Sequence, residues 1–223
     1  MVDVTKLPQI KLVSWDVDGT LYSINRMKWR LMRRFLVEVA GRRGLKARRE
    51  LAMLMRYRAQ VNTARPNGGE LAENFLEQNG REDVLEVEKR WYGLAIQQAG
   101  PRAGVNSVMA FLAESGIPQV VISDYEAKYK LDSLGLAGRF SSIYVGERLG
   151  FVKPSPVLFQ RAAADFRTST ANLLHLGDRA DRDDAAARAA GCQCLILGRD
   201  FQHFDGLLAA LSAVPKDHFN ENP

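Results

Sequence analysis

Short apolar runs alternate with amphipathic helical segments over most of the chain. Five runs have the length and composition of buried strands, at about residues 10–15, 119–123, 142–145, 173–176 and 192–197. Helical segments are expected between and after the later runs, at about residues 105–115, 126–134, 156–165, 181–190 and 206–213. This alternation predicts an α/β fold with a Rossmann-like parallel sheet that helices cover on both faces.

One long segment interrupts the alternation, because residues 22–99 carry almost no strand signal. Helices are expected from Ile24 to about Val39 and at about residues 46–62, 70–78 and 82–98. In the second of them, Leu51, Leu54, Met55 and Val61 are expected to face inward. We therefore predict a helical-bundle cap domain at 22–99, inserted into an α/β core domain formed by 1–21 and 100–214, and a flexible tail at 215–223.

Length and composition fit one core with an insertion. The chain has 223 residues, 46% of them hydrophobic, and no apolar run reaches the roughly 18 residues needed to span a bilayer. The first nine residues include Asp3 and lack the hydrophobic segment of a secretory signal. Cys192 and Cys194 are too close together for an ordinary disulfide framework, so we expect them to pack in a buried strand. A cytoplasmic protein without membrane attachment is expected.

The net charge of +5 is unevenly distributed. Residues 25–65 contain 13 Lys or Arg side chains, and only Glu38 and Glu50 oppose them. Such a basic segment can attract an anionic substrate, nucleic acid or a membrane surface. The solvated faces of amphipathic helices explain the same pattern at least as well.

Two aspartates end the first apolar run, in the sequence Asp16-Val17-Asp18-Gly19. Residues two apart on a strand point the same way, so we expect both carboxylates to project from one strand end. Like charges at close range repel each other and raise a pKa, and a divalent cation such as Mg²⁺, which prefers oxygen ligands, offsets that repulsion. An acidic surface turn is the alternative interpretation.

Polar side chains also follow the later apolar runs. They are Ser123 and Asp124 after the second run, Lys153 after the third, and Asp178 and Asp183 after the fourth. Because ligands of parallel sheets bind at the carboxyl ends of the strands, we expect these groups to converge there. Asp181 and Asp184 are interpreted as acids that favour a helix start, and His175 as a structural residue of a buried strand.

These residues fall into four short motifs. In chain order they are Asp16-Val17-Asp18-Gly19-Thr20-Leu21, Val121-Ile122-Ser123-Asp124, Gly146-Glu147 with Lys153-Pro154-Ser155-Pro156, and His175-Leu176-Gly177-Asp178 with Asp183. With this set, the chain resembles the haloacid dehalogenase-like hydrolase superfamily over almost its whole length. The helical insertion resembles the small α-helical cap found in its phosphatase branch. One departure is Arg182, where family members often carry Asn.

The resemblance implies a reaction at Asp16. Asp16 would be the nucleophile that takes a phosphoryl group as an aspartyl-phosphate, and Asp18 would protonate the leaving oxygen and then deprotonate water. Mg²⁺ would be held by the Asp16 side chain, the Asp18 backbone carbonyl and Asp178, with Asp183 as a further acidic candidate. Asp18 also favours phosphate chemistry over carbon–halogen cleavage, because haloacid dehalogenases proper lack this second aspartate.

By the same resemblance, Ser123 would hydrogen-bond a phosphoryl oxygen, and Lys153 would offset the charge of that group and of Asp16. Thr20 and the backbone amide of Asp124 are further candidate phosphate contacts. The candidate contacts to the rest of the substrate come from the start of the insertion and from its Gly-rich loop, and they are Tyr22, Arg26, Arg65 and Asn67.

The sequence thus predicts an Mg²⁺-dependent phosphatase that hydrolyses a small phosphorylated metabolite of the phosphoglycolate, sugar-phosphate or nucleotide type. A sugar phosphomutase of the same family is one alternative, because a cap that excludes water would return the phosphoryl group to the sugar. A non-catalytic binding module, with a basic cap that docks nucleic acid or an acidic partner, is another. The complete acidic and lysine set disfavours the binding module, so nucleic acid is not expected as a partner. A monomer and a homodimer are both compatible with the sequence.

Overall fold

Five parallel strands form the centre of the molecule. The computed structural model describes residues 9–41 and 44–214, so the predicted tail at 215–223 lies outside the described residues. The strands are β1 (Leu12–Trp15), β2 (Gln119–Ser123), β3 (Ser142–Val145), β4 (Leu173–Gly177) and β5 (Gln193–Ile196). They pair in the order β3-β2-β1-β4-β5, and every pair is parallel. The predicted Rossmann-like sheet is confirmed.

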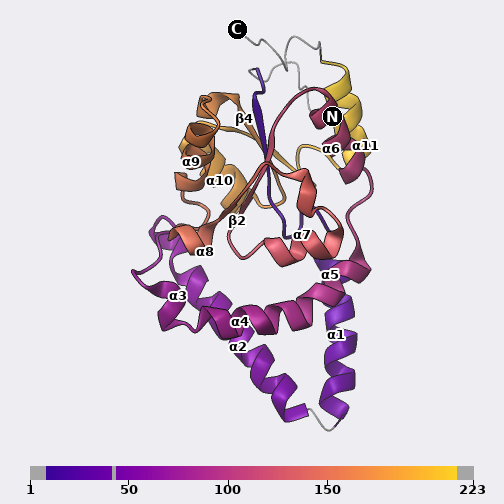
Figure 1. Ribbon diagram of the computed structural model, residues 1–223, viewed down its shortest axis with the longest axis vertical. Coiled ribbons are helices and arrows are strands. Elements are labelled where there is room, and N and C mark those ends of the chain that lie inside the picture. Colours follow the sequence, from indigo (N-terminus) through magenta and orange to yellow (C-terminus); the bar gives the residue numbers. More distant parts are fainter. Residues whose placement is uncertain (1–8, 42–43, 215–223) are drawn as a thin grey trace.

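Helices cover both faces of the sheet, because its strands are apolar on both sides. Side chains alternate along β1, so Val13 and Trp15 join one core cluster and Leu12 joins the other. Figure 1 shows the covering helices on the two sides, α6 (Val105–Glu114) and α11 (Phe204–Ser212) on one and α9 (Val157–Asp165) and α10 (Ala185–Ala190) on the other. Two further helices follow β2 and β3, α7 (Lys128–Leu134) and α8 (Gly146–Leu149).

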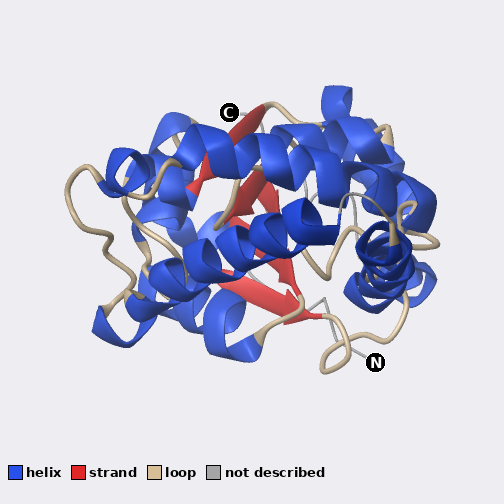
Figure 2. Ribbon diagram, turned by 90° about the horizontal axis from the view of Figure 1, so that it is seen from below, coloured by secondary structure: helices blue, strands red, loops and turns tan. Residues whose placement is uncertain are grey.

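The segment between β1 and α6 is built from helices and short turns. Its elements are α1 (Ile24–Ala40), α2 (Gly44–Thr63), a 3₁₀ turn (Arg65–Asn67), α3 (Phe75–Gln78), α4 (Arg81–Glu88), a π-helical turn (Lys89–Gly93) and α5 (Leu94–Ala99). We call residues 24–99 the helical insertion. It lies at one end of the sheet, at the bottom of Figure 1, and Figure 2 shows helices in front of the strands when the molecule is seen from that end.

The helix predicted at 70–78 is shorter than expected. It begins only at Phe75, because the backbone before it pairs with the core instead of with itself: the amide of Leu71 donates to the carbonyl of Gly150 at 2.8 Å. The helix predicted at 82–98 is interrupted by the π-helical turn. At the first of these places a tertiary contact overrides local helix propensity.

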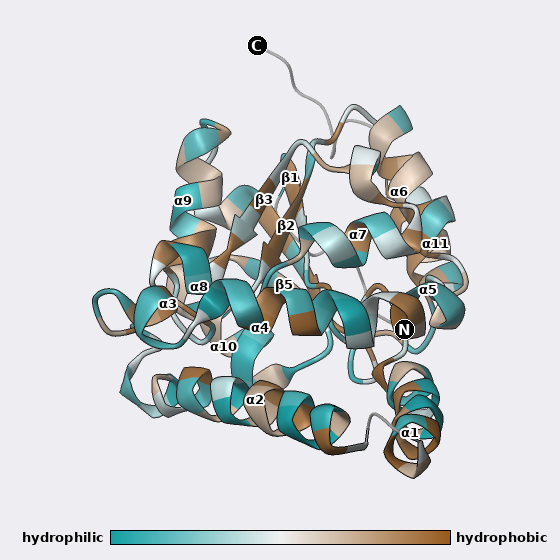
Figure 3. Ribbon diagram, turned by 60° about the horizontal axis from the view of Figure 1, so that its bottom comes forward, coloured by the Kyte–Doolittle hydropathy of each residue, from teal (hydrophilic) through white to brown (hydrophobic). Residues whose placement is uncertain are grey.

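One predicted inward position in α2 is wrong. Met55 is 64% exposed, whereas Leu54, Tyr57 and Val61 are buried and form the inner row at spacings of three and four. Figure 3 shows the consequence, with hydrophobic residues concentrated on the strands and mixed hydropathy along α2. Among the helices of the described residues, none is both long and apolar enough to cross a membrane.

A buried network of charges joins the helical insertion to the core. Arg81 of α4 is 4% exposed, and its Nη2 lies 2.6 Å from Oε1 of Glu147 in α8 and 3.0 Å from Oε2 of Glu88. The hydroxyl of Tyr57 in α2 donates to Glu147 at 2.8 Å, and the backbone amide of Glu126 donates to the same carboxylate at 2.7 Å. Arg81 therefore compensates two buried carboxylates at once.

The two cysteines are free; Cys192 directly precedes β5 and Cys194 lies within it. Burial raises the pKa of Cys192 to about 12 and also raises the pKa of Cys194. Since the thiolate is the reactive form, a pKa of about 12 leaves on the order of 10³ times fewer thiolates than an ordinary cysteine has.

We therefore expect a thiol reagent such as Ellman's reagent to react slowly at pH 8 with the folded protein and rapidly with the protein in guanidinium. Stopped-flow absorbance measures both rates, and the unfolded sample serves as the control that counts two thiols. Reaction of both thiols within seconds in the folded protein would contradict the buried environment described here.

Candidate active site

The end of β1 lies beside the end of β4, at the place where the strand order reverses. From β1 the chain passes to β2 and β3 on one side and to β4 and β5 on the other. The backbone amide of Asp16 donates to the carbonyl of Leu176 at 2.9 Å, which joins the two strand ends. Open parallel sheets bind ligands outside the carboxyl ends of the strands at such a reversal. Asp16 and Asp178 therefore occupy the expected ligand position.

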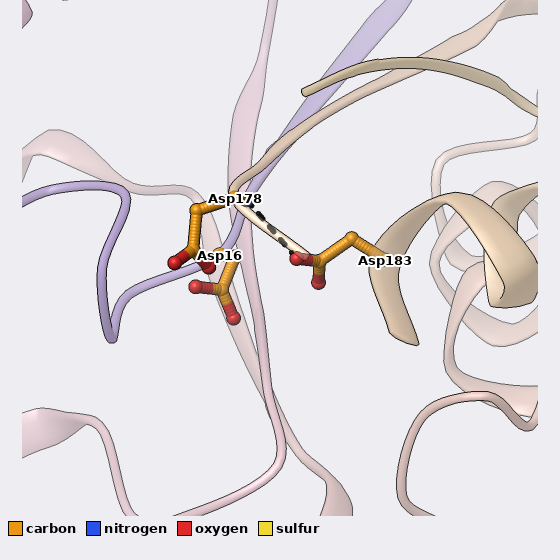
Figure 4. Close-up of side chains that lie close together, drawn as sticks. All are labelled: Asp16, Asp178 and Asp183. Carbon is orange, nitrogen blue, oxygen red and sulfur yellow. Dashed lines mark hydrogen bonds between the residues drawn. The ribbon is translucent and has the colours of Figure 1, made fainter. Parts of the chain in front are cut away.

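Three carboxylates meet at this position. Asp16, Asp178 and Asp183 each offer an oxygen atom, and these atoms lie within 4.8 Å of one another (Figure 4). Burial raises the pKa of Asp16 well above its ordinary value, and Asp183 and Asp178 add to the rise while Lys153 opposes it. Burial and the charge of Asp183 raise the pKa of Asp178 to about 6. Asp16 is 7% exposed, so an acidic surface turn is excluded.

The carboxylate cluster fits a hard divalent cation. Asp178 Oδ1 is buried and has no hydrogen-bond partner among the described residues. A buried carboxylate oxygen without a partner is costly, and a bound cation would satisfy it and offset the mutual repulsion. Gly19 leaves room there: its φ is +105°, and a Cβ atom at this residue would collide with the Asp178 carboxylate.

Lys153, in the segment after β3, contacts two carboxylates of the cluster. Its side chain is buried, and its Nζ lies 2.6 Å from Asp16 Oδ1 and 2.5 Å from Asp183 Oδ1. Burial alone would lower the pKa of Lys153, but the two carboxylates outweigh it and raise the pKa, so the ammonium stays charged. Its backbone amide donates to Asp124 Oδ1 at 2.7 Å, which fixes the lysine to the end of β2.

Asp183 is already held by the protein on both oxygens. Its Oδ2 accepts from the backbone amides of Asp178 at 3.1 Å and Arg179 at 2.9 Å, and its Oδ1 binds Lys153 and lies 3.3 Å from Nε2 of His175. Burial works to raise the pKa of Asp183, but Lys153 and then His175 lower it well below its ordinary value. Asp183 thus positions Lys153 and the loop after β4. His175 is fully buried in β4, as the structural interpretation predicts.

Asp18 has other partners than Asp16. Its Oδ2 lies 2.5 Å from Nζ of Lys130 in α7, and its Oδ1 accepts from the hydroxyl of Tyr22. Burial raises the pKa of Asp18, but Lys130 and Arg58 lower it overall. Strand β1 ends at Trp15, so the alternation of a strand no longer applies at Asp16 and Asp18.

The candidate phosphate contacts surround Asp16 from two strand ends. Thr20 Oγ1 donates to Asp16 Oδ2 at 3.3 Å. Ser123 Oγ donates to the carbonyl of Tyr125 at 2.9 Å, and Asp124 accepts from Lys153 and forms an ion pair of 2.9 Å with Arg65.

The four candidate substrate contacts separate into two pairs. Tyr22 and Arg65 contact residues of the four motifs, since the hydroxyl of Tyr22 donates to Asp18 and Arg65 forms an ion pair with Asp124. Arg26 and Asn67 are exposed, and among the described residues no hydrogen bond or ion pair links their side chains to the carboxylate cluster. Arg26 instead lines a cavity of about 360 Å³ beside Pro101 and His203.

Three basic residues near the carboxylates were not predicted from the sequence. Lys130 binds Asp18, Arg58 of α2 lies near Asp18, and Arg102 donates to the carbonyl of Gly19 at 3.0 Å from Nε and 2.7 Å from Nη2. None follows a strand directly or belongs to one of the four motifs. Arg58 is one of the 13 basic residues of the segment 25–65, and its sequence neighbours do not distinguish it.

The fold and the cluster are those of an α/β enzyme with an acidic, lysine-containing centre. The family model of the haloacid dehalogenase-like hydrolases matches residues 10–191. The chain belongs to this family and is a hydrolase of it.

Two relatives agree with this assignment, and one solved structure is similar in fold. The chain is 40% identical over 128 residues to a phosphoglycolate phosphatase of Neisseria gonorrhoeae, a match that spans 52% of this chain and 53% of that enzyme, about half of each. It is 26% identical to a phosphoglycolate phosphatase of Yersinia pseudotuberculosis over 97% of this chain and 93% of that enzyme. Its fold is similar to that of the magnesium-bound putative HAD-hydrolase YfnB of Bacillus subtilis, with a TM-score of 0.65, 17% identity and coverage of 92% of this chain and 99% of that one.

Proposed function

We propose that the protein is an Mg²⁺-dependent phosphatase that hydrolyses a small phosphorylated metabolite through an aspartyl-phosphate on Asp16. The observation that carries the proposal is the buried contact of Lys153 Nζ with Asp16 Oδ1 at 2.6 Å, inside a cluster of three carboxylates at the strand-order reversal. The two phosphoglycolate phosphatases to which the chain is similar support the same reaction. They make 2-phosphoglycolate the first substrate to test.

The proposed reaction has two displacements. In the first, an oxygen of Asp16 bonds to phosphorus while the bond from phosphorus to the leaving oxygen breaks, and Asp18 gives that oxygen a proton. Against the effect of burial, Lys130 and Arg58 lower the pKa of Asp18 in the protein alone, so Asp18 has to take up this proton from solvent when the anionic substrate binds and raises its pKa. In the second, the oxygen of a water molecule bonds to phosphorus while Asp18 takes a proton from that water. The bond between phosphorus and the Asp16 oxygen then breaks.

Lys153 would offset the charge of the phosphoryl oxygens in both displacements. Ser123 and Thr20 would donate to these oxygens by turning their hydroxyl hydrogens away from the Tyr125 carbonyl and from Asp16, their acceptors in the protein alone.

The Mg²⁺ ion would be held by the side chains of Asp16 and Asp178 and by the backbone carbonyl of Asp18. When bound, it would supply positive charge that lets an anionic phosphate approach a carboxylate. Asp183 then acts on the site through Lys153 and the loop after β4, since its own oxygens are taken.

The helical insertion is proposed to act as the cap of this active site. Arg65 of the insertion forms an ion pair with Asp124, which directly follows β2, so the insertion contacts the carboxyl end of this strand. Such caps exclude water and provide specificity. The free thiols of Cys192 and Cys194 support a reducing compartment, and we propose the cytoplasm.

Phosphate release from a panel of metabolites tests the function. With Mg²⁺, we expect turnover of 2-phosphoglycolate or a related monoester, and with excess EDTA we expect a loss of at least about 10²-fold, since the carboxylates then repel the substrate. Restoration by added Mg²⁺ is the control for damage by the chelator. Isomerisation of a sugar phosphate without net phosphate release would show a mutase instead, and absence of turnover with every substrate would contradict the proposal.

A further inference from the structure

Helix α1 is apolar on two sides, although it lies at the surface. Its inner side packs into the larger hydrophobic cluster of the protein through Ile24, Met27, Leu31, Phe35 and Val39. Its outer side carries a second apolar row, Trp29, Met32 and Leu36, at spacings of three and four. Trp29 is 66% exposed, and the other two are also more than half exposed. Single exposed apolar residues need no explanation, but a contiguous apolar patch marks an interaction site.

Cations flank this apolar row. Arg26, Arg30 and Arg33 form a neighbouring row on α1, at spacings of four and three, and all three are exposed. Their side chains have no ion pair or hydrogen bond with any other described residue. Helix α2 adds four more exposed cations, which are Lys46, Arg48, Arg49 and Arg56. The two helices therefore combine positive charge with apolar side chains at the surface.

The acidic residues of α1 and α2 do not offset these cations. The two helices contain only Glu38 and Glu50, and neither is exposed. Arg90 of the π-helical turn forms an ion pair with both carboxylates, and Glu50 also accepts from the indole of Trp91 at 2.7 Å. The surface of these helices thus presents cations without an exposed carboxylate, which is the complement of an anionic partner.

The position of the two helices leaves this surface accessible. Figure 1 shows α1 and α2 at the bottom, at the end of the molecule away from the sheet. Figure 3 shows both hydrophobic and hydrophilic residues along α1. We call the residues Arg26, Trp29, Arg30, Met32, Arg33 and Leu36 the outer face of α1. It is the convex face of a projecting helix.

A lipid surface fits this face better than other partners do. Nucleic acid offers phosphates to the cations but no apolar layer to Trp29 and its neighbours. A second copy of the chain would bring the same cations against each other. A protein partner would need a groove of matching shape. The interface of an anionic bilayer adapts to a helix and offers both charged headgroups and apolar chains.

We propose that the outer face of α1 binds an anionic lipid surface, with its arginines at the headgroups and Trp29, Met32 and Leu36 in the layer below them. Such a helix lies in the plane of the interface, and it binds through buried apolar area and attraction to anionic lipids. Trp suits this position because its ring is apolar and its N–H is polar. The binding is peripheral and reversible. It goes beyond the proposed phosphatase function and differs from the expectation, drawn from the sequence, of a protein without membrane attachment.

Co-sedimentation of the full-length protein with lipid vesicles tests the proposal. One set of vesicles is phosphatidylcholine alone, and the other contains phosphatidylcholine and phosphatidylglycerol at about 2:1. We expect binding to the anionic vesicles to be at least about 10-fold stronger than to the neutral ones, and to weaken as salt screens the charges. Binding should also shift the tryptophan fluorescence to the blue. This shift reports on α1, because Trp15 and Trp91 are already buried.

Two double variants separate the contributions of charge and apolar area. Arg30→Glu with Arg33→Glu should weaken binding to the anionic vesicles by about 30-fold or more, the combined value of two cations near a charged lipid surface. Trp29→Ser with Leu36→Ser should weaken it by about 10-fold, because less apolar area is buried, and should abolish the blue shift.

Arg161→Glu with Arg188→Glu is the matched control. It makes the same change of charge at exposed positions of α9 and α10, which lie far from α1 in Figure 1. In about 0.1 M salt it should weaken binding by less than about threefold, since charges more than about 10 Å from the lipid are screened. Thermal unfolding of every variant checks that the fold is kept.

Four results would overturn the proposal. They are no binding to the anionic vesicles at low salt, equal binding to both kinds of vesicle, an equal loss in the matched control, and full binding by the Trp29→Ser, Leu36→Ser variant. The last result would show attraction by charge alone, without docking of the apolar row. A dimer seen by light scattering that is lost in the same variant would identify a second copy of the chain as the occupant instead.

Discussion

Asp16→Asn should lower kcat for 2-phosphoglycolate or for the best substrate of the panel by about 10⁴-fold or more, because the amide cannot form the phosphoryl bond. The fold should persist. Asp16 is a buried carboxylate whose pKa is raised by burial, so a neutral amide of the same shape removes a desolvated charge, and Lys153 keeps Asp183 as its partner. Phosphate release measures the first effect, and thermal unfolding measures the second.

The matched control is Asp181→Asn, an exposed aspartate in the same acidic segment that pairs with Arg179 at 2.9 Å. It should change kcat by less than about threefold, since exposed ion pairs contribute little. If Asp16→Asn kept more than about 1% of the wild-type rate, a water molecule rather than Asp16 would be the attacking group, and the aspartyl-phosphate would be excluded.

Arg81→Met should give the largest loss of stability. The substitution leaves Glu147 and Glu88 buried side by side without their cation, and breaking a buried ion pair costs about 3–5 kcal/mol in the free energy of unfolding. Burial already raises the pKa of Glu147, and the loss of Arg81 would raise it further. A carboxyl group whose pKa is raised in the folded protein lowers the free energy of unfolding once it becomes ionised, and this loss increases as the pH rises toward the raised pKa. The destabilisation should therefore be smaller at pH 5 than at pH 8.

Urea unfolding of both proteins at the two pH values measures this effect. Arg161→Met provides the same chemical change at an exposed ion pair, Arg161–Asp165, where the side chains are 65% and 43% exposed, and it should cost less than about 1 kcal/mol. Two results would contradict this prediction: equal losses in the free energy of unfolding in the two variants, or a loss in Arg81→Met that does not depend on pH. Either would show that the buried ion pairs between the insertion and the core do not stabilise the fold.

Two residues of the carboxylate cluster could be predicted from their positions in the sequence. Asp16 and Asp178 come directly after strands, and the carboxyl ends of parallel strands meet at one edge, so chain position alone predicts their convergence. Lys153 was found through its motif, although seven residues separate it from the end of β3. The short apolar run that ends at Val145 predicted strand β3.

The direction of individual side chains could not be predicted in the same way. Asp18 was expected to project with Asp16, but both lie beyond the last residue of β1, and Lys130 and Tyr22 decide where the Asp18 carboxylate points. Likewise, Met55 and Leu54 are adjacent apolar residues of one helix, and only packing against the rest of the insertion decides that Leu54 is the buried one.

The sequence by itself therefore determined the α/β class, the five strands and the acidic groups at their ends, because all of these depend on local periodicity and on positions next to strands. Tertiary structure decided the strand order that brings β1 beside β4, and it decided which distant cations meet Asp18. Arg58 and Lys130 are 72 residues apart, and they come together near one carboxylate only because the insertion folds over the strand ends. Contacts of this range leave no local pattern, since the energies that select them come from burial and pairing in the folded chain.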